Sequence, residues 1–497
     1  MSEDLQKLVD TAEASITAAA AIAETDKSRP LYHFRAPSQW MDDPNGIIFH
    51  DGWYHMMYSL NPHSAEHRAG MVYKTAVRVW DPNSEDWTGG ITVWGHARSR
   101  DLVHWEHLPI AVYPSIDKGE HFVWFGCTVI NDEGIPMAIY TAVGPDLRPE
   151  DTAQQWAAIG SPDLMSWKPL PSNPMIDYDV HNGEVIGEWR DPFVFKAAGR
   201  TFMVLGGRKK QADGEGRAVV ALYEATNPSF TKWVYRGIIF THPRSTVPSA
   251  ECPNLFKLDG KWVMFVSPHA EVEYYVGELD LENYTFSVEG SGVVDHSRNF
   301  YATNVLFDGD GRAVCWGALV GFTDTIGWNC CVSLPRELKL EGGKLVQRPV
   351  QELDALLDET INIEGSVEAR TELSVGKVAE VQALEISCSF DHAADESFGL
   401  RIRNDNSLLD IAVSQDELQL GTLTAKVHRN GTKTELRLFI DRTVAEIFLN
   451  SETCAAKVIP LMHGAADISI WSSKSAVQFK GSISTLRAND LFTSSRG

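Results

Sequence analysis

The stretch Trp40-Met41-Asp42-Asp43-Pro44-Asn45-Gly46 places two carboxylates beside a proline in an aromatic setting. Two later segments share this character, Trp189-Arg190-Asp191-Pro192 and Glu251-Cys252-Pro253-Asn254. All three are short, and they lie far apart along the chain. Such a distribution is typical of a pocket lined by several strands or loops, so the sequence favours a fold of many short strands around one site.

The chain before residue 340 has the pattern of a series of short strands. Apolar and aromatic runs recur between Pro, Gly, Asn and Asp residues, which mark turns. A weak repeat is also visible, because the segment 99–105 is similar to 161–167 and less closely to 227–233. Strand-rich repeats of this kind predict the blades of a β-propeller. The run Asp308-Gly309-Asp310-Gly311 lacks the later ligands of a calcium loop, and we interpret it as a hairpin turn.

The pattern changes after about residue 340. Tryptophan becomes scarce, and apolar residues alternate with polar ones in segments such as 398–403 and 436–441. A period of two predicts strands with one buried face, as in an antiparallel β-sandwich. The sequence therefore predicts an all-β protein with two kinds of β domain.

Composition limits the partners. The formal net charge of −23 disfavours nucleic acid and membranes, whereas a neutral small molecule or oligosaccharide such as a sugar is compatible with it. No apolar run is long enough to span a membrane, and residues 1–29 are expected to form a helical extension with Ser2 as N-cap. Seven scattered cysteines indicate a reducing, cytoplasmic setting, with no metal and no cofactor. Assembly into a homo-oligomer is left open.

The acidic segments resemble the signature segments of glycoside hydrolase family 32, which contains invertases, fructanases and fructosyltransferases. The resemblance covers nearly the whole chain after residue 30, with the segments in the family's order. Further matches are Trp94-Gly95-His96-Ala97, Asn299-Phe300-Tyr301-Ala302, Ser333-Leu334-Pro335-Arg336-Glu337-Leu338, Phe439-Ile440-Asp441-Arg442 and Ala445-Glu446-Ile447-Phe448.

This resemblance implies a five-bladed β-propeller followed by a C-terminal β-sandwich. The expected division is a helical extension over residues 1–29, the propeller over 30–338, a linker with a short helix over 339–357, and the sandwich over 358–497.

The resemblance also implies a retaining β-fructofuranosidase that cleaves sucrose or short fructans through a covalent fructosyl-enzyme. Asp43 matches the nucleophile, Glu251 the acid/base and Asp191 the transition-state stabiliser. The chemistry needs this division, because the nucleophile must be ionised while the acid must keep its proton near neutral pH. We therefore expect the pKa of Glu251 to be raised.

Seven other residues are candidates for substrate binding by the same resemblance. Arg190 could pair with Asp191 or donate to the sugar, and Tyr301 could tune the acid/base. The aromatic candidates have an equally good interpretation as core residues. Asp42, where the family usually has Asn, is either a pocket residue or an outward-facing turn residue. The full set is Trp40, Asp42, Asn45, Trp94, Arg190, Tyr301 and Trp316.

Three other functions fit part of the pattern. A fructosyltransferase differs from a hydrolase only in the acceptor, and Ser59, Trp124 and Asn254 depart from common family residues where they could reshape the leaving-group side. The intact carboxylate trio argues against a non-catalytic carbohydrate-binding propeller. The C-terminal sandwich and the segment that contains Asp43 argue against an arabinan-type hydrolase.

Overall fold

The structure is a computed structural model that describes residues 3–65, 91–148, 150–211, 214–427 and 431–495. The predicted all-β class is confirmed, since strands dominate and the described residues hold a single α-helix. That helix confirms the predicted N-terminal helical segment, while its predicted cap, Ser2, lies outside the described residues. In the described part of the chain, no helix is both long and apolar enough to cross a membrane. Within the described ranges, the helices are α1 (Glu3–Ala23) and the 3₁₀ turns η2 (Ile116–Lys118), η3 (Tyr178–His181) and η4 (Gln351–Leu356).

Residues 39–349 form five sheets whose strands mostly follow one another in chain order. The first sheet contains β1 (Gln39–His50), β2 (Trp53–Asn61), β3 (Val93–Ser99) and β4 (Trp105–Val112), with β19 (Trp328–Asn329) and β35 (Phe492–Ser494) at its edges. The second contains β5 (Phe122–Ile130), β6 (Pro136–Val143), β7 (Gln154–Gly160) and β8 (Trp167–Pro169). The third contains β9 (Gly187–Ala197), β10 (Arg200–Lys210), β11 (Gly216–Ala225) and β12 (Trp233–Thr241). The fourth contains β13 (Glu251–Leu258), β14 (Lys261–Ser267), β15 (Glu273–Asp280) and β16 (Thr285–Val293), and the fifth β17 (Phe300–Phe307), β18 (Ala313–Leu319), β20 (Cys331–Val332), β21 (Arg336–Glu341) and β22 (Lys344–Pro349).

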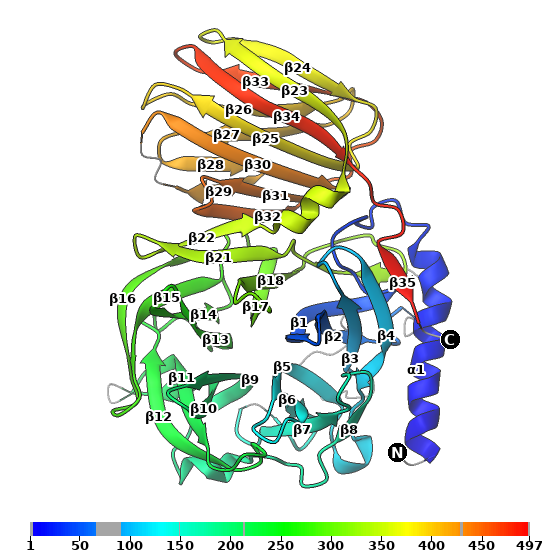
Figure 1. Cartoon of the computed structure of the whole chain (residues 1–497), viewed down its shortest axis with the longest axis vertical. Helices are drawn as coiled ribbons and strands as arrows, with labels where there is room; N and C mark the ends of the chain where they lie inside the picture. The colour runs from blue at the N-terminus through cyan, green and yellow to red at the C-terminus, as the bar shows by residue number, and fades with distance from the viewer. Residues whose placement is uncertain (1–2, 66–90, 149, 212–213, 428–430, 496–497) are drawn as a thin grey trace.

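The five sheets close into a ring through their first strands. β1 packs against β5 and β17, β5 packs against β9, and β13 packs against β9 and β17. A short parallel pairing of β19 with β1 also ties the end of the ring to its beginning. Figure 1 shows the five sheets arranged around a common centre, which we call the five-sheet ring.

Tight turns explain why the first two strands of three sheets pair. Asp51-Gly52, Ala198-Gly199 and Asp259-Gly260 each form a two-residue loop with positive φ at both positions. This is the geometry of a type I′ turn, which matches the twist of an antiparallel hairpin and favours glycine at its second position. The predicted hairpin at residues 308–311 is also confirmed, because the Asp308 N–H donates to the Arg312 carbonyl at 3.0 Å.

The weak sequence repeat is a repeated turn before the fourth strand of a sheet. Trp105, Trp167 and Trp233 begin β4, β8 and β12, and each indole N–H donates to a carbonyl three residues earlier. The residues that supply these carbonyls, Leu102, Leu164 and Phe230, all have a left-handed backbone with φ between 53 and 64°. The repeat therefore encodes the same corner in three successive sheets.

Two six-stranded sheets follow the ring, and we call them the sheet pair. Apolar side chains from both sheets, among them Leu384, Ile386, Leu400 and Ile402, form one buried core. One sheet contains β23 (Leu357–Val367), β25 (Ala383–Asp391), β30 (Lys433–Asp441), β31 (Val444–Leu449), β32 (Thr453–Val458) and β34 (Val477–Leu486). The other contains β24 (Glu372–Val378), β26 (Phe398–Arg403), β27 (Leu408–Val413), β28 (Glu417–Leu420), β29 (Leu423–Lys426) and β33 (Ala466–Ser472).

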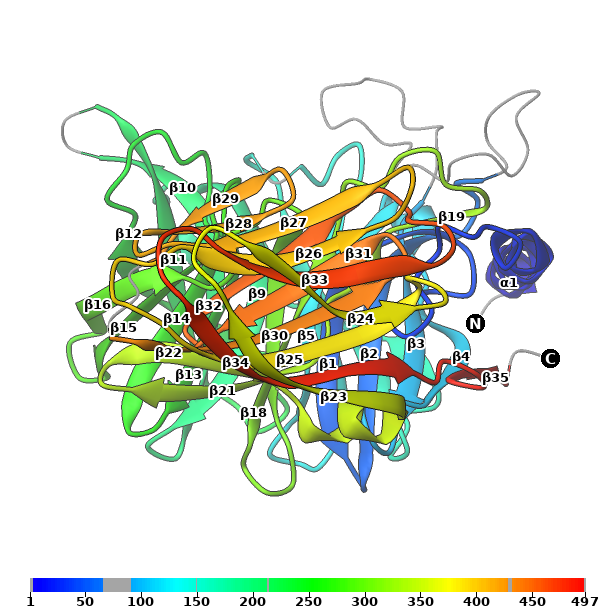
Figure 2. The same cartoon turned by 90° about the horizontal axis from the view of Figure 1, so that it is seen from above.

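The sheet pair covers one side of the ring, as Figures 1 and 2 show from two directions. Phe439 and Phe448 on the ring-facing sheet are buried in the same core as residues of β1 and β2. The chain then returns to the ring, because β35 pairs in parallel with β4. η4 confirms the predicted short linker helix, and the fifth sheet of the ring continues through β21 and β22 to Pro349.

Candidate active site

A cavity of about 330 Å³ lies where the first strands of all five sheets meet. It contains four carboxylates, one arginine and one histidine, and its walls are partly aromatic. The three acids singled out from the sequence are brought together here, although they come from different sheets. The lining residues are Trp40, Asp42, Asp43, Ser59, Thr92, Trp124, Phe125, Arg190, Asp191, Glu251, Cys252, His269, Tyr301 and Val320.

A break in pairing occurs at a corresponding place in each of the five innermost strands. Two residues of the inner strand stand opposite one residue of its neighbour at 42–43, 124–125, 191–192, 252–253 and 302–303. A β-bulge of this kind bends the strand and re-aims its side chains. Asp191, Cys252 and Ala302 accordingly have left-handed backbones, with φ of 69, 46 and 48°. The bulges explain how consecutive residues such as Asp42 and Asp43 both reach the cavity, where strict alternation would send one of them away.

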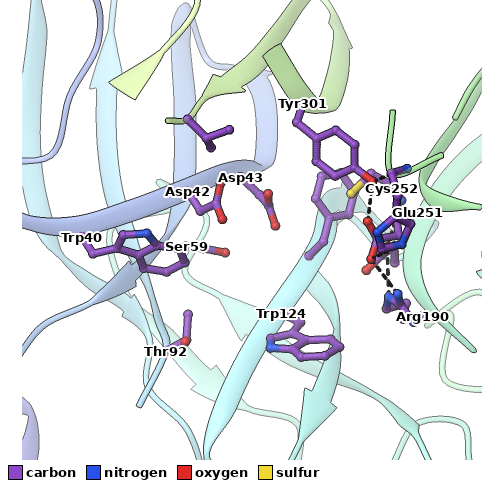
Figure 3. Close-up of a pocket in the computed structure, with 14 residues that line it drawn as sticks. Trp40, Asp42, Asp43, Ser59, Thr92, Trp124, Arg190, Glu251, Cys252 and Tyr301 are labelled. Carbon is purple, nitrogen blue, oxygen red and sulfur yellow. Dashed lines mark hydrogen bonds and ion pairs between the residues drawn. The ribbon is translucent and has the colours of Figure 1, made fainter. Parts of the chain in front are cut away.

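The orientation of Asp42 is therefore settled. Its side chain lines the cavity next to that of Asp43, and it is not an outward-facing turn residue. Figure 3 shows both carboxylates on one side of the cavity, with Glu251 and Arg190 on the other.

Glu251 is held by three neighbours. Its Oε1 accepts a hydrogen bond from Arg190 Nη2 at 2.6 Å and lies 3.3 Å from His269 Nε2. Its Oε2 accepts from the Tyr301 hydroxyl at 2.5 Å. Arg190 also donates to Glu188 through Nη1, at 2.5 Å. Arg190 was expected to pair with Asp191, but its short contacts are with Glu251 and Glu188, and its Nε stands 3.9 Å from Asp191 Oδ2.

These contacts shift the pKa values of Glu251 and Asp191 in opposite directions. Burial favours the neutral form of Glu251, but Arg190 and His269 outweigh it and hold the pKa of Glu251 well below its ordinary value. Burial raises the pKa of Asp191 to about 6; Arg190 opposes this rise and the negative charge of Glu251 adds to it. Asp191 also accepts a hydrogen bond from the Cys252 N–H at 2.8 Å. The expected elevation of the Glu251 pKa is therefore wrong, because the sequence did not reveal how many cations face this carboxylate.

Three predicted binding residues are buried beneath the cavity wall and do not line it: Asn45, Trp94 and Trp316. Asn45 donates to Ser59 Oγ at 2.9 Å and accepts from the Gly126 N–H at 3.2 Å, which ties β1 to β2 and β5. The Trp94 indole donates to the carbonyl of Trp124 at 3.0 Å. Asn45 and Trp94 thus support lining residues from behind, whereas Trp316 is a buried core residue.

Several lining residues were not predicted as binding residues. Ser59 and Trp124 stood out only as departures from family residues, and Thr92, His269 and Val320 gave no signal. His269 lies in a loop after β14, far in sequence from the residues that it contacts, so only the fold reveals it. Among the described residues, no group of three or more His, Cys, Asp or Glu side chains is placed to hold a metal ion.

Comparison with known proteins gives the family. The model described as "Glycosyl hydrolases family 32 N-terminal domain" matches residues 33–77 and 79–349, and "Glycosyl hydrolases family 32 C terminal" matches residues 352–488. A levanase of Bacillus subtilis is 28% identical over 483 residues, which are 85% of this chain and 64% of that protein. A sucrose-6-phosphate hydrolase of Zymomonas mobilis is 27% identical over 470 residues, 85% of this chain and 84% of that protein.

Solved structures share the fold at lower identity. A family 32 β-fructofuranosidase from Bombyx mori has a TM-score of 0.75 and 23% identity, over 98% of this chain and 99% of that one. Fructan 1-exohydrolase IIa from Cichorium intybus has a TM-score of 0.75 and 21% identity, over 94% of this chain and 99% of that one. Because the two family models together match most of the chain, and three acids from separate sheets share one cavity, this protein belongs to glycoside hydrolase family 32.

Proposed function

We propose that this protein is a retaining β-fructofuranosidase, acting on sucrose or short fructans through a covalent fructosyl-enzyme. The observation that carries the proposal is the meeting of Asp43, Asp191 and Glu251 in one cavity of a family 32 chain. Relatives named levanase and sucrose-6-phosphate hydrolase support a fructoside as substrate.

Each acid has a role that fits its surroundings. The carboxylate of Asp43 attacks the anomeric carbon, and Glu251 protonates the departing glycosidic oxygen as the bond to that oxygen breaks. Water then loses a proton to Glu251 and displaces Asp43 from the anomeric carbon, which releases fructose with its configuration retained. Asp191 is fixed by the Cys252 N–H and is placed to bind sugar hydroxyls as charge develops on the ring.

The charge of the cavity favours a neutral sugar. Four carboxylates face it, and the guanidinium of Arg190 is already engaged by Glu188 and Glu251. A phosphate group brought close to these carboxylates would be repelled. We therefore assign a non-phosphorylated fructoside as substrate, in contrast to the phosphorylated sugar in the names of several relatives.

The architecture that supports this function is assigned here as a five-bladed β-propeller followed by a β-sandwich. The closed contacts between the innermost strands support five blades, and the shared core of the sheet pair supports the sandwich. We place the helical extension at residues 1–29, the propeller from residue 30 to about 349, and the sandwich after η4. The propeller is assigned beyond residue 338 because β21 and β22 belong to the fifth sheet. Seven free, buried cysteines support a cytoplasmic, reducing setting.

The test is product analysis with sucrose, inulin-type and levan-type oligomers and sucrose 6-phosphate, at low and high substrate concentration. We expect release of free fructose, with weaker action on the phosphorylated sugar. Glu251→Gln should lower kcat on sucrose about 10²–10⁴-fold, the usual contribution of general acid/base catalysis. Glu278→Gln, an exposed glutamate on β15 of the same sheet, is the matched control and should keep full activity.

Each contrary result has a definite meaning. Longer fructosides in place of free fructose would identify a fructosyltransferase. Binding of fructosides without any turnover would identify a carbohydrate-binding protein. Near-normal turnover by Glu251→Gln would overturn the acid/base assignment.

A further inference from the structure

His269 stands between solvent and Glu251. It follows β14 after Ser267-Pro268 and has a left-handed backbone, with φ of 58°. The backbone N–H of His269 donates to the Tyr301 hydroxyl at 2.9 Å, and the centroids of the two rings lie 6.4 Å apart. The loop is thus tied to the residue that holds the other oxygen of Glu251, so the position of the imidazole is defined.

The contacts of the imidazole suit proton transfer. Nε2 lies 3.3 Å from Glu251 Oε1 and 3.2 Å from Ser249 Oγ. The His269 side chain is 44% exposed, whereas that of Glu251 is 18% exposed. Arg190 occupies the inner side of the same carboxylate, with a side chain only 8% exposed. Of the two basic groups on Glu251, only the imidazole is both accessible to water and able to gain and lose a proton near neutral pH.

Glu251 needs such a partner. Its two cationic neighbours favour the ionised carboxylate at rest, yet the proposed reaction requires it to give a proton and later take one back. The charged and titratable groups that face His269 come from three strands besides its own loop. They are Glu188 and Arg190 on β9, Glu251 on β13 and Tyr301 on β17.

We propose that His269 relays protons between solvent and Glu251; this proposal rests on the proposed function. In the first step, Nε2–H of the imidazolium gives its proton to Oε1 of Glu251, and the imidazole becomes neutral. Glu251 passes a proton to the glycosidic oxygen, which leaves with the electron pair of its bond to the anomeric carbon as the Asp43 carboxylate bonds to that carbon. After water has given a proton to Glu251 and its oxygen has displaced Asp43 from the anomeric carbon, the proton returns to Nε2. His269 exchanges protons with solvent between these events.

The relay explains how Glu251 can be ionised at rest and still become protonated during the reaction. The attraction of the imidazolium for Glu251 disappears as the proton moves, so the same transfer that protonates the acid removes one of the charges that held it ionised. His269 is a positioning residue in this scheme, because it acts on Glu251 and not on the sugar.

The test compares His269→Gln and His269→Ala in the full-length protein. Gln keeps a hydrogen-bond donor for Glu251 but cannot relay a proton, and Ala leaves an opening to solvent that free imidazole can enter. We expect both variants to lower kcat on sucrose about a hundred-fold, the lower end of the range for general acid/base catalysis, with little change in KM. The limb of the kcat–pH profile near neutrality should move, and added imidazole should restore His269→Ala but not His269→Gln.

Control variants distinguish a failure of the His269 relay from a failure of the proposed function. His104→Gln removes a comparably exposed histidine that pairs with Asp101 at 2.8 Å outside the cavity, and it should keep the wild-type profile. If Glu251→Gln is inactive while both His269 variants keep the wild-type kcat and pH profile, the relay is wrong and the proposed function stands. If activity falls with no change in the pH profile and no rescue by imidazole, His269 only shapes the pocket and the relay is also wrong. Normal turnover by Glu251→Gln would instead defeat the proposed function itself.

Discussion

At the scale of single residues, Asp42 places a second carboxylate beside Asp43, the proposed nucleophile. Its carboxylate lies beside that of Asp43, and an ionised carboxylate can only accept hydrogen bonds from a sugar hydroxyl. The amide common at this position in the family could also donate, either to the sugar or to Asp43. We therefore expect a preferred substrate to present hydrogen-bond donors to both carboxylates.

Asp42→Asn should shift the preference of the enzyme toward sucrose. The amide removes one negative charge beside Asp43 and supplies a donor, which suits a sugar that offers an acceptor there. We expect the ratio of kcat/KM for sucrose to that for a short fructan to rise about tenfold, which corresponds to about 1.4 kcal/mol. Asp51→Asn, in the exposed turn of the same hairpin, is the matched control. An unchanged ratio together with an unchanged acidic limb of the pH profile would make Asp42 a bystander.

The sequence predicted which acids lie in the cavity better than which other residues form its walls. Asp43, Asp191 and Glu251 could be named because each stands in a short recognisable segment, and the structure places all three in one cavity. Proximity to such a segment does not tell which way a side chain points, and Asn45 therefore lies beneath the wall. His269 could not be predicted because its contact with Glu251 depends on the pairing of β13 with β14, and its contact with Tyr301 depends on the packing of the fifth sheet against the fourth.

At the scale of elements, α1 contributes to the ring through one narrow stripe. Ala12, Ile16, Ala19 and Ala23 are fully buried at helical spacing, and the small residues let the helix approach the ring closely. The Ser38 hydroxyl donates to the Ile16 carbonyl at 2.7 Å, just before β1 begins. The helix thus packs beside the strand that carries Asp43.

Ile16→Ala should weaken this attachment. Removing a buried isoleucine side chain typically costs about 2–5 kcal/mol, because apolar burial is lost and a cavity remains. We expect a lower thermal midpoint, with earlier proteolytic cleavage of the N-terminal segment. Leu8→Ala is the matched control, since Leu8 on the same helix is 42% exposed. Equal midpoints for the two variants would show that α1 adds no stability to the ring.

Local patterns predicted the elements for physical reasons. The repeated corner was visible as a Trp at a fixed offset, because its indole must reach a carbonyl three residues earlier. The five bulges were not visible, since a bulge depends on the register of two strands and not on one of them. The alternation of residues 436–441 predicts that Phe439 faces away from the core of the sheet pair, but it does not predict that this side chain is buried against the ring.

At the scale of the whole molecule, buried ion pairs join three parts of the chain. His33, before β1, contacts Asp441 Oδ2 at 2.9 Å and Glu446 Oε1 at 3.1 Å on the ring-facing sheet of the sheet pair. Arg336, on β21 of the ring, contacts Glu446 Oε2 at 2.7 Å and Asp295 Oδ2 at 2.8 Å. All five side chains are fully buried. Two of the C-terminal family segments therefore serve the junction between ring and sheet pair, and not the cavity.

The protonation of His33 makes this junction sensitive to alkaline pH. Burial disfavours the charged imidazole, but hydrogen bonds to Asp441 and Glu446 outweigh burial and raise the pKa of His33 to about 9. A folded-state pKa above the unfolded value of 6.5 stabilises the protein fully below pH 6.5, and this stability is lost as the pH rises through about 9. The amount at stake is on the order of 3 kcal/mol.

We therefore expect the thermal midpoint of the wild-type protein to fall between pH 7 and 9.5 by more than that of His33→Gln. The variant should already be less stable at pH 7, because Asp441 and Glu446 then lose a buried cationic partner, a change that costs about 3–5 kcal/mol. His463→Gln removes an exposed histidine of the sheet pair and should follow the wild-type curve. Groups other than His33 that titrate in this range act on both proteins, so the difference between the two curves isolates His33. Parallel curves for wild type and His33→Gln would show that His33 does not carry its charge across this junction.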